Sequence, residues 1–81
     1  VDGWKIQIAA APSQSSAQDQ LKKARAAAPK ILASADDYLE PVSKDGATLY
    51  RARFSGFKSK DAARAACSYL ARKNVSCLAL Q

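Results

Sequence analysis

Two stretches of the chain, Lys5–Ala9 and Leu49–Phe54, alternate apolar or small residues with more polar ones. A period of two is typical of a strand with one face on a core and the other in water. Each stretch is followed within a few residues by a serine and then by an alanine-rich amphipathic run. The pattern therefore predicts two similar strand-then-helix units, and the polar face of the two strands is the first place to look for function.

The alanine-rich runs predict the two helices. Ser13 or Ser16 can cap the first helix, and Pro29 interrupts it because proline disfavours helical geometry in the residue before it. Ser59 caps the second, and Asn74 can take the left-handed position after its end. The core-facing stripes are Ala17, Leu21, Ala24 and Ala28 in the first helix, and Ala63, Ala66, Cys67 and Leu70 in the second.

Two further strands complete the pattern. Pro41 indicates that the extended segment 37–42 is an edge strand, and Asp45-Gly46 is a hairpin signal before the returning strand. Ile31 and Leu32 are expected to form a turn that helps to cover the core. The strands are predicted over residues 4–10, 37–42, 48–54 and 75–80. The order βαββαβ predicts an α+β fold of the ferredoxin-like or RNP-like type, a four-stranded antiparallel sheet with both helices on one face.

In the usual split arrangement the first and third strands lie side by side in the centre of the sheet. Strict alternation then places Gln7 beside Arg51 and Arg53 on the surface away from the helices. The residues expected to face the helices are Trp4, Ile6, Ile8, Tyr50, Ala52, Phe54, Val75, Cys77 and Ala79. Those expected to face outward are Lys5, Gln7, Ala9, Leu49, Arg51, Arg53, Ser76, Leu78 and Leu80.

Composition limits the classes of function. The chain has 81 residues, a net charge of +6 and no histidine. It is long enough for one small domain, and no apolar run approaches the ~20 residues of a membrane span. The start at Val1 is typical of a module cut from a longer protein. The basic charge favours an anionic partner such as nucleic acid, anionic lipid or acidic polysaccharide, although a solubilising charge without a partner is equally compatible.

The two cysteines, Cys67 and Cys77, are too few for a zinc site without histidine. Two free core thiols and a disulfide in an oxidising compartment are both compatible with the composition. Cys67 and Cys77 fall on the predicted core faces of neighbouring elements, which favours the disulfide. Closing so short a loop would stabilise the fold by roughly 2–3 kcal/mol on the chain-entropy model.

The sequence holds no convincing catalytic, metal-binding or cofactor-binding constellation. Histidine, the commonest general acid–base residue, is missing, and the glycines do not form a phosphate-binding loop. Asp36, Asp37 and Glu40 are explained by a solvated loop and edge strand. We therefore expect a binding module without catalytic activity, metal or cofactor.

The expected polar face suits hydrogen bonding to a polymer. Gln7 offers donors and an acceptor, while Arg51 and Arg53 offer planar forks suited to carboxylates. RNA-binding sheets of this topology stack bases on exposed aromatic residues of the central strands. Here Tyr50 and Phe54 are expected to face the helices, so nucleic acid becomes a minor alternative. The alternative to ligand binding is that these polar residues simply cover a sheet face that is exposed to water.

Three segments together resemble a SPOR domain (sporulation-related repeat): residues 4–10, residues 50–57 and the helix over 59–70. The resemblance spans about residues 4–80 and extends to the C-terminal SPOR modules of alphaproteobacterial D-alanyl-D-alanine carboxypeptidases, including the cysteine pair. It implies a monomeric periplasmic module that binds peptidoglycan, in particular glycan strands without stem peptides at the division septum, and targets a cell-wall enzyme there. A protein–protein interaction module of the cell envelope is the alternative.

The resemblance also implies which residues meet the glycan. Gln7 matches the family's glutamine on the first strand, and Arg51 matches the arginine of the third-strand motif. Some relatives carry a serine where this chain has Ala10, and an exposed aromatic residue where it has Leu49. Tyr38 is a possible substitute for that aromatic residue, but the sequence reasoning leaves its face open. The expected glycan-binding residues are Lys5, Gln7, Ala9, Leu49, Arg51 and Arg53.

Overall fold

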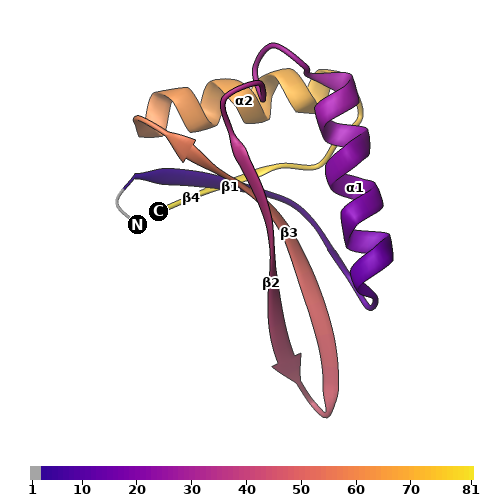
Figure 1. Ribbon diagram of the computed structural model, residues 1–81. Helices are drawn as coiled ribbons and strands as arrows, with labels where there is room; N and C mark the ends of the chain where they lie inside the picture. Colours follow the sequence, from indigo (N-terminus) through magenta and orange to yellow (C-terminus); the bar gives the residue numbers. More distant parts are fainter. Residues whose placement is uncertain (1–2) are drawn as a thin grey trace.

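The sheet is antiparallel, with strand order β2-β3-β1-β4, in a computed structural model that describes residues 3–81. Figure 1 shows both helices on the same side of this sheet and the β2–β3 hairpin projecting beyond them. The predicted α+β fold with its βαββαβ order is confirmed. The elements are β1 (Trp4–Ala11), α1 (Gln14–Ala27), β2 (Asp36–Lys44), β3 (Ala47–Phe57), α2 (Lys60–Arg72) and β4 (Leu78–Leu80).

Both helices begin at the predicted serine caps. The Ser13 hydroxyl accepts a hydrogen bond from the Ser16 N–H at 3.2 Å, and Ser59 accepts one from Ala62 at 3.1 Å. Each bond satisfies one of the free N–H groups of a helical first turn. At the other end of α2, Asn74 adopts the predicted left-handed conformation, with φ of 63°. The local signals thus fix where the helices start and where α2 ends.

The core lies between the helices and one face of the sheet, and it is built mainly from small residues. Within residues 3–81, eight of the fourteen buried apolar residues are alanine, so the helices lie close to the strands. The larger residues include Phe54, from β3, and Leu32, from the α1–β2 connection, neither of which is exposed to solvent. The prediction that this connection helps to cover the core is confirmed.

Arg25 fastens that connection to α1. Its guanidinium donates to the backbone carbonyl oxygens of Leu32 at 2.7 Å and Ala35 at 3.1 Å, and it pairs with the Asp37 carboxylate at 3.3 Å. The guanidinium carbon also lies 5.3 Å from the centre of the Phe54 ring. One side chain therefore holds a loop that has little regular structure of its own.

Cys67 and Cys77 form a disulfide, which confirms the predicted pairing. The bond joins α2 to the segment just before β4. That segment was expected to continue the strand from Val75, yet β4 begins only at Leu78. The reason is that Val75 donates its N–H to the Leu70 carbonyl at 2.9 Å and so closes the end of α2, while Cys77 is bonded to that helix.

The alternation of β1 is broken by a bulge, which corrects the predicted orientation of Ala9. Gln7 pairs with Arg53, but the next pair is Ala9 with Ala52, so Ile8 is an extra residue on the β1 side. Ala52 is fully buried against the helices, and Ala9 shares its side of the sheet. The expectation that Ala9 faces outward is therefore wrong. An extra residue shifts the phase of every later side chain by one position.

Candidate functional site

The sheet surface away from the helices, called the open face from here on, collects most of the predicted site residues. Antiparallel pairing places residues of four strands in rows across this surface, because directly paired residues point to the same side. From β2 toward β4, the rows are Asp36, Ser55, Lys5 and Leu80; then Tyr38, Arg53, Gln7 and Leu78; then Glu40, Arg51 and Ala10.

Arg53 lies at the centre of the open face and already contacts two polar side chains. Its Nε donates to Gln7 Oε1 at 2.9 Å, and its Nη1 lies 2.8 Å from Glu40 Oε2. Only 9% of the residue is exposed. The arginine therefore ties β1, β3 and β2 together beneath the surface. Its predicted contact with a ligand stays a prediction, and the geometry favours an indirect role.

The bond from Arg53 fixes the orientation of the Gln7 amide. Because Oε1 faces the guanidinium, Nε2 is left to donate, and no described residue accepts a hydrogen bond from it. Gln7 is half-buried between Arg53 and Leu78 in its row. The site thus presents a positioned amide donor whose acceptor must come from outside the described residues.

Arg51 and Leu49 follow Arg53 toward the hairpin tip on the same face. Both are half-buried, and within residues 3–81 Arg51 makes no ion pair. Its neighbour on β1 is Ala10, and no β4 residue lies in that row. The guanidinium of Arg51 is therefore the more accessible of the two. Ala10, which the bulge turns toward this face, takes the place that was predicted for Ala9.

Tyr38 is the site residue whose face sequence reasoning left open. It pairs with Arg53 and so lies on the open face. The signal that locates it was present: Asp45-Gly46 is a two-residue turn that pairs Lys44 with Ala47, and counting back along both strands pairs Tyr38 with Arg53. Tyr38 also lines a hollow of about 380 Å³ with Lys5 and Ser55. The open face therefore carries the Tyr38 ring beside an amine and a hydroxyl.

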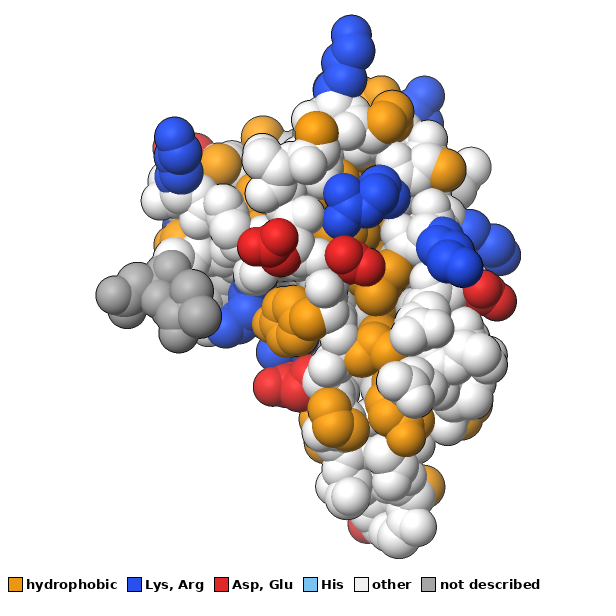
Figure 2. All heavy atoms as spheres, viewed as in Figure 1, with side chains coloured by type: hydrophobic (Ala, Val, Ile, Leu, Met, Phe, Trp, Pro, Cys, Tyr) orange, Lys and Arg blue, Asp and Glu red, His pale blue; other side chains and the backbone are white. Residues whose placement is uncertain are grey.

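The chemistry of the open face is that of hydrogen bonding and charge pairing. Its donors are the Gln7 amide, Arg51 and Lys5, its acceptors include Asp36 and Glu40, and Tyr38 is a single ring rather than a platform for successive bases. On the side seen in Figure 2, basic side chains are spread out and separated by acidic ones, not gathered into one patch. The mixed donors and acceptors of the open face suit a polymer with hydroxyls and occasional carboxylates better than a densely charged nucleic acid.

A metal-binding cluster and a membrane-spanning helix are both absent from the described part of the chain. Residues 3–81 contain no group of three or more histidine, cysteine, aspartate or glutamate residues that could hold a metal ion. No helix within those residues is long and apolar enough to span a membrane.

Comparisons with known proteins identify relatives at the levels of sequence and fold. The cell division protein FtsN of Caulobacter vibrioides (strain NA1000 / CB15N) is 36% identical over 72 residues, which are 89% of this chain and 27% of that protein. The crystal structure of the RlpA SPOR domain from Pseudomonas aeruginosa has a TM-score of 0.80 at 16% identity and covers 98% of this chain and 99% of its own. The solution structure of the peptidoglycan binding domain of the B. subtilis cell wall lytic enzyme CwlC has a TM-score of 0.68 at 23% identity, covering 95% and 85%.

The chain thus spans about a quarter of the length of FtsN, and the two solved structures share its fold. The family model of the SPOR domain matches residues 1–81, the whole chain. The resemblance noted from the two strand-and-helix units is confirmed by that match: this chain belongs to the SPOR domain family.

Proposed function

We propose that this domain is a non-catalytic module that binds peptidoglycan through the open face. It recognises glycan strands that lack stem peptides, acts as a monomer, and directs an attached cell-wall enzyme to the division septum from the periplasm. The similarity to a cell division protein and to a peptidoglycan binding domain supports this proposal. The disulfide is consistent with an oxidising compartment such as the periplasm.

The observation that carries the proposal is the orientation of Gln7. Arg53 holds Gln7 Oε1 at 2.9 Å, so the amide nitrogen is preset to donate to an acceptor on the open face. A donor positioned before binding loses less conformational entropy when its partner arrives. Sugar hydroxyl, ring and amide oxygens supply acceptors of that kind along a glycan strand.

The chemistry of each remaining side chain indicates which part of the glycan it contacts. Arg51 and Lys5 pair with the lactyl carboxylates of muramic acid, which are free when stem peptides have been removed. The Tyr38 ring packs against one sugar face at the hollow that Lys5 and Ser55 share with it. Arg53 contributes by holding Gln7 and Glu40 in place rather than by touching the glycan.

Binding to purified cell walls tests this function. The domain is incubated with intact sacculi and with sacculi whose stem peptides an amidase has removed, and the bound fraction is measured after sedimentation. We expect retention on the amidase-treated material and little on the intact material. Equal retention on both would contradict the specificity for stripped strands, and no retention on either would overturn the function itself.

Matched variants test the surface. Gln7→Ala and Arg51→Ala should each weaken sedimentation with treated sacculi by about ten-fold, the equivalent of roughly 1.4 kcal/mol. Gln18→Ala and Arg64→Ala remove the same side chains from exposed positions on α1 and α2, and should bind like the unaltered domain. Thermal unfolding of all four variants excludes loss of fold as the cause. Normal binding by both open-face variants would show that the glycan binds elsewhere.

Targeting needs a separate test in cells. The domain fused to an exported fluorescent protein should accumulate at midcell, and amidase-deficient cells should lose that accumulation. Uniform labelling of the envelope in cells that have active amidases would contradict septal targeting without affecting the binding measurements.

A further inference from the structure

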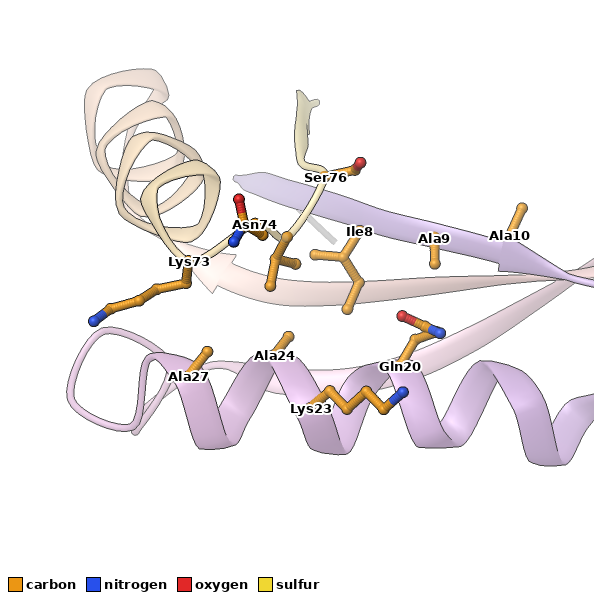
Figure 3. A pocket seen from close by; sticks show the side chains of 11 residues that line it. Ile8, Ala9, Ala10, Gln20, Lys23, Ala24, Ala27, Lys73, Asn74 and Ser76 are labelled. Atoms are coloured by element: carbon orange, nitrogen blue, oxygen red, sulfur yellow. The ribbon is translucent and has the colours of Figure 1, made fainter.

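A second recess lies away from the open face, between the end of β1, α1 and the turn that leads from α2 to β4. Figure 3 shows this recess, with Ala9 pointing toward α1 and Ala10 pointing the other way. Its volume is about 670 Å³, and it is bounded on the α1 side by Gln20 and Lys23 and on the α2 side by Lys73 and Asn74. None of the open-face donors lines it, so it requires its own explanation.

One wall of the recess is an unpaired strand edge. β4 pairs with β1 only at Lys5, Ile6 and Gln7, although β1 continues to Ala11. Within residues 3–81, no backbone hydrogen bond joins the stretch from Ile8 to Ala11 to the turn before β4. The N–H and C=O groups that this stretch directs away from β3 therefore have no strand beside them. Such an edge is a template for an added strand.

The charge of the recess selects the kind of strand. Lys23 lies on α1 and Lys73 directly follows α2; both are exposed, and among residues 3–81 no acidic residue lines the recess. The Lys73 amine lies 5.7 Å from the centre of the Tyr69 ring, a contact that an exposed lysine can leave easily. Alanines at positions 9, 24 and 27 keep the walls shallow enough for a backbone to approach.

We propose that this recess binds an extended acidic peptide segment of another protein, which adds as a strand along Ile8–Ala11. The segment would occupy the course that β4 leaves empty, and its carboxylates would pair with Lys23 and Lys73. Backbone hydrogen bonds supply affinity in this mode, and the side chains supply selectivity. Because the open-face donors Lys5, Gln7 and Arg51 lie outside the recess, the domain would hold a protein and a glycan strand at the same time.

The experiment uses the whole domain, labelled with ¹⁵N, and a capped seven-residue peptide of alternating glutamate and valine. Titration followed by NMR should shift the amide signals of residues 8–11, 23 and 73–76 in a saturable way, and slow hydrogen exchange of the residue 8–11 amides at least five-fold. Two N-methylated forms of the peptide carry methyl groups on alternate backbone nitrogens. We expect one form to lose binding and the other to keep it, because only alternate residues donate to a neighbouring strand.

Charge-reversal variants provide the second test of this peptide site. Lys23→Glu combined with Lys73→Glu should weaken peptide binding at least ten-fold, whereas Lys22→Glu combined with Lys58→Glu keeps the same net charge and should change it less than two-fold. The first pair should leave sedimentation with amidase-treated sacculi unchanged, which separates this site from the proposed glycan function. Signal shifts centred on Arg51, equal binding by both N-methylated peptides, or no saturable binding would overturn the proposal.

Discussion

Replacing Arg53 with methionine is the most direct way to separate support from contact on the open face. Methionine has a similar length and no charge, so the substitution removes the bond to Gln7 and the pair with Glu40 while retaining most of the packing. The side chain of Arg53 is 10% exposed and that of Glu40 is 44% exposed. Glu40 can therefore hydrate when its partner is lost, and most of the cost comes from the charge-assisted bond to the half-buried amide.

A charge-assisted hydrogen bond contributes about 1.5–3 kcal/mol, whereas an ion pair with one exposed partner contributes at most about 1 kcal/mol. Taking about 2 kcal/mol in total, a domain of this size should lose about 8–16 °C in Tm. Arg51→Met changes the same residue type two positions along the same strand and should alter stability by no more than about 0.5 kcal/mol.

Urea unfolding followed by circular dichroism measures both variants. We expect Arg53→Met to lower the unfolding midpoint and Arg51→Met to leave it unchanged. For sacculus binding, measured at a temperature where both variants are folded, we expect Arg51→Met to weaken binding more than Arg53→Met. Adding Glu40→Gln to Arg53→Met should cost little more, because the pair is already broken. Equal midpoints for the two methionine variants would refute the supporting role of Arg53.

Three further predictions concern the rest of the fold. Reducing the disulfide between Cys67 and Cys77 should lower the free energy of unfolding by roughly 2–3 kcal/mol, measured as a lower urea midpoint with reductant present, and an unchanged midpoint would contradict this. Arg25→Ala should cost about 2 kcal/mol because two backbone carbonyls lose their donor, whereas Lys22→Ala, on the same helix, should cost less than about 0.5 kcal/mol in the same assay. Gly46→Ala should lower stability by about 1 kcal/mol because Gly46 has φ of 79°, although nothing obstructs the added methyl group; thermal unfolding would show this, and an unchanged Tm would argue against strain.

The parts of the fold that were predictable are those with a local cause. Serines before alanine-rich runs located both helix starts, and the period of two located β1 and β3. The bulge at Ile8 has no comparable signal, because Ile-Ala-Ala-Ala is as compatible with strict alternation as with an extra residue. The predicted outward orientation of Ala9 was consequently wrong, and Ala10 lies on the open face instead.

The sequence also could not distinguish Arg51 from Arg53, which occupy equivalent positions in the alternating pattern. Their difference comes from the neighbouring strands. Arg53 lies between Gln7 and Tyr38, and Glu40 reaches its guanidinium; Arg51 has Ala10 on the β1 side and no β4 residue beyond it. Burial of a polar residue on a sheet is thus decided by the register of three strands, which no single stretch of sequence encodes.

The alanine-rich core has a consequence for how the sequence can vary. In a core of large side chains, the damaging changes are truncations, which leave cavities. Among the fourteen buried apolar positions in the described part of this chain, truncation is costly at six. At the eight alanines the damaging change is enlargement, which forces the helices away from the sheet. Saturation mutagenesis should therefore tolerate glycine or serine better than valine or leucine at Ala52 and Ala66, in contrast to the usual ranking of buried positions by hydrophobicity.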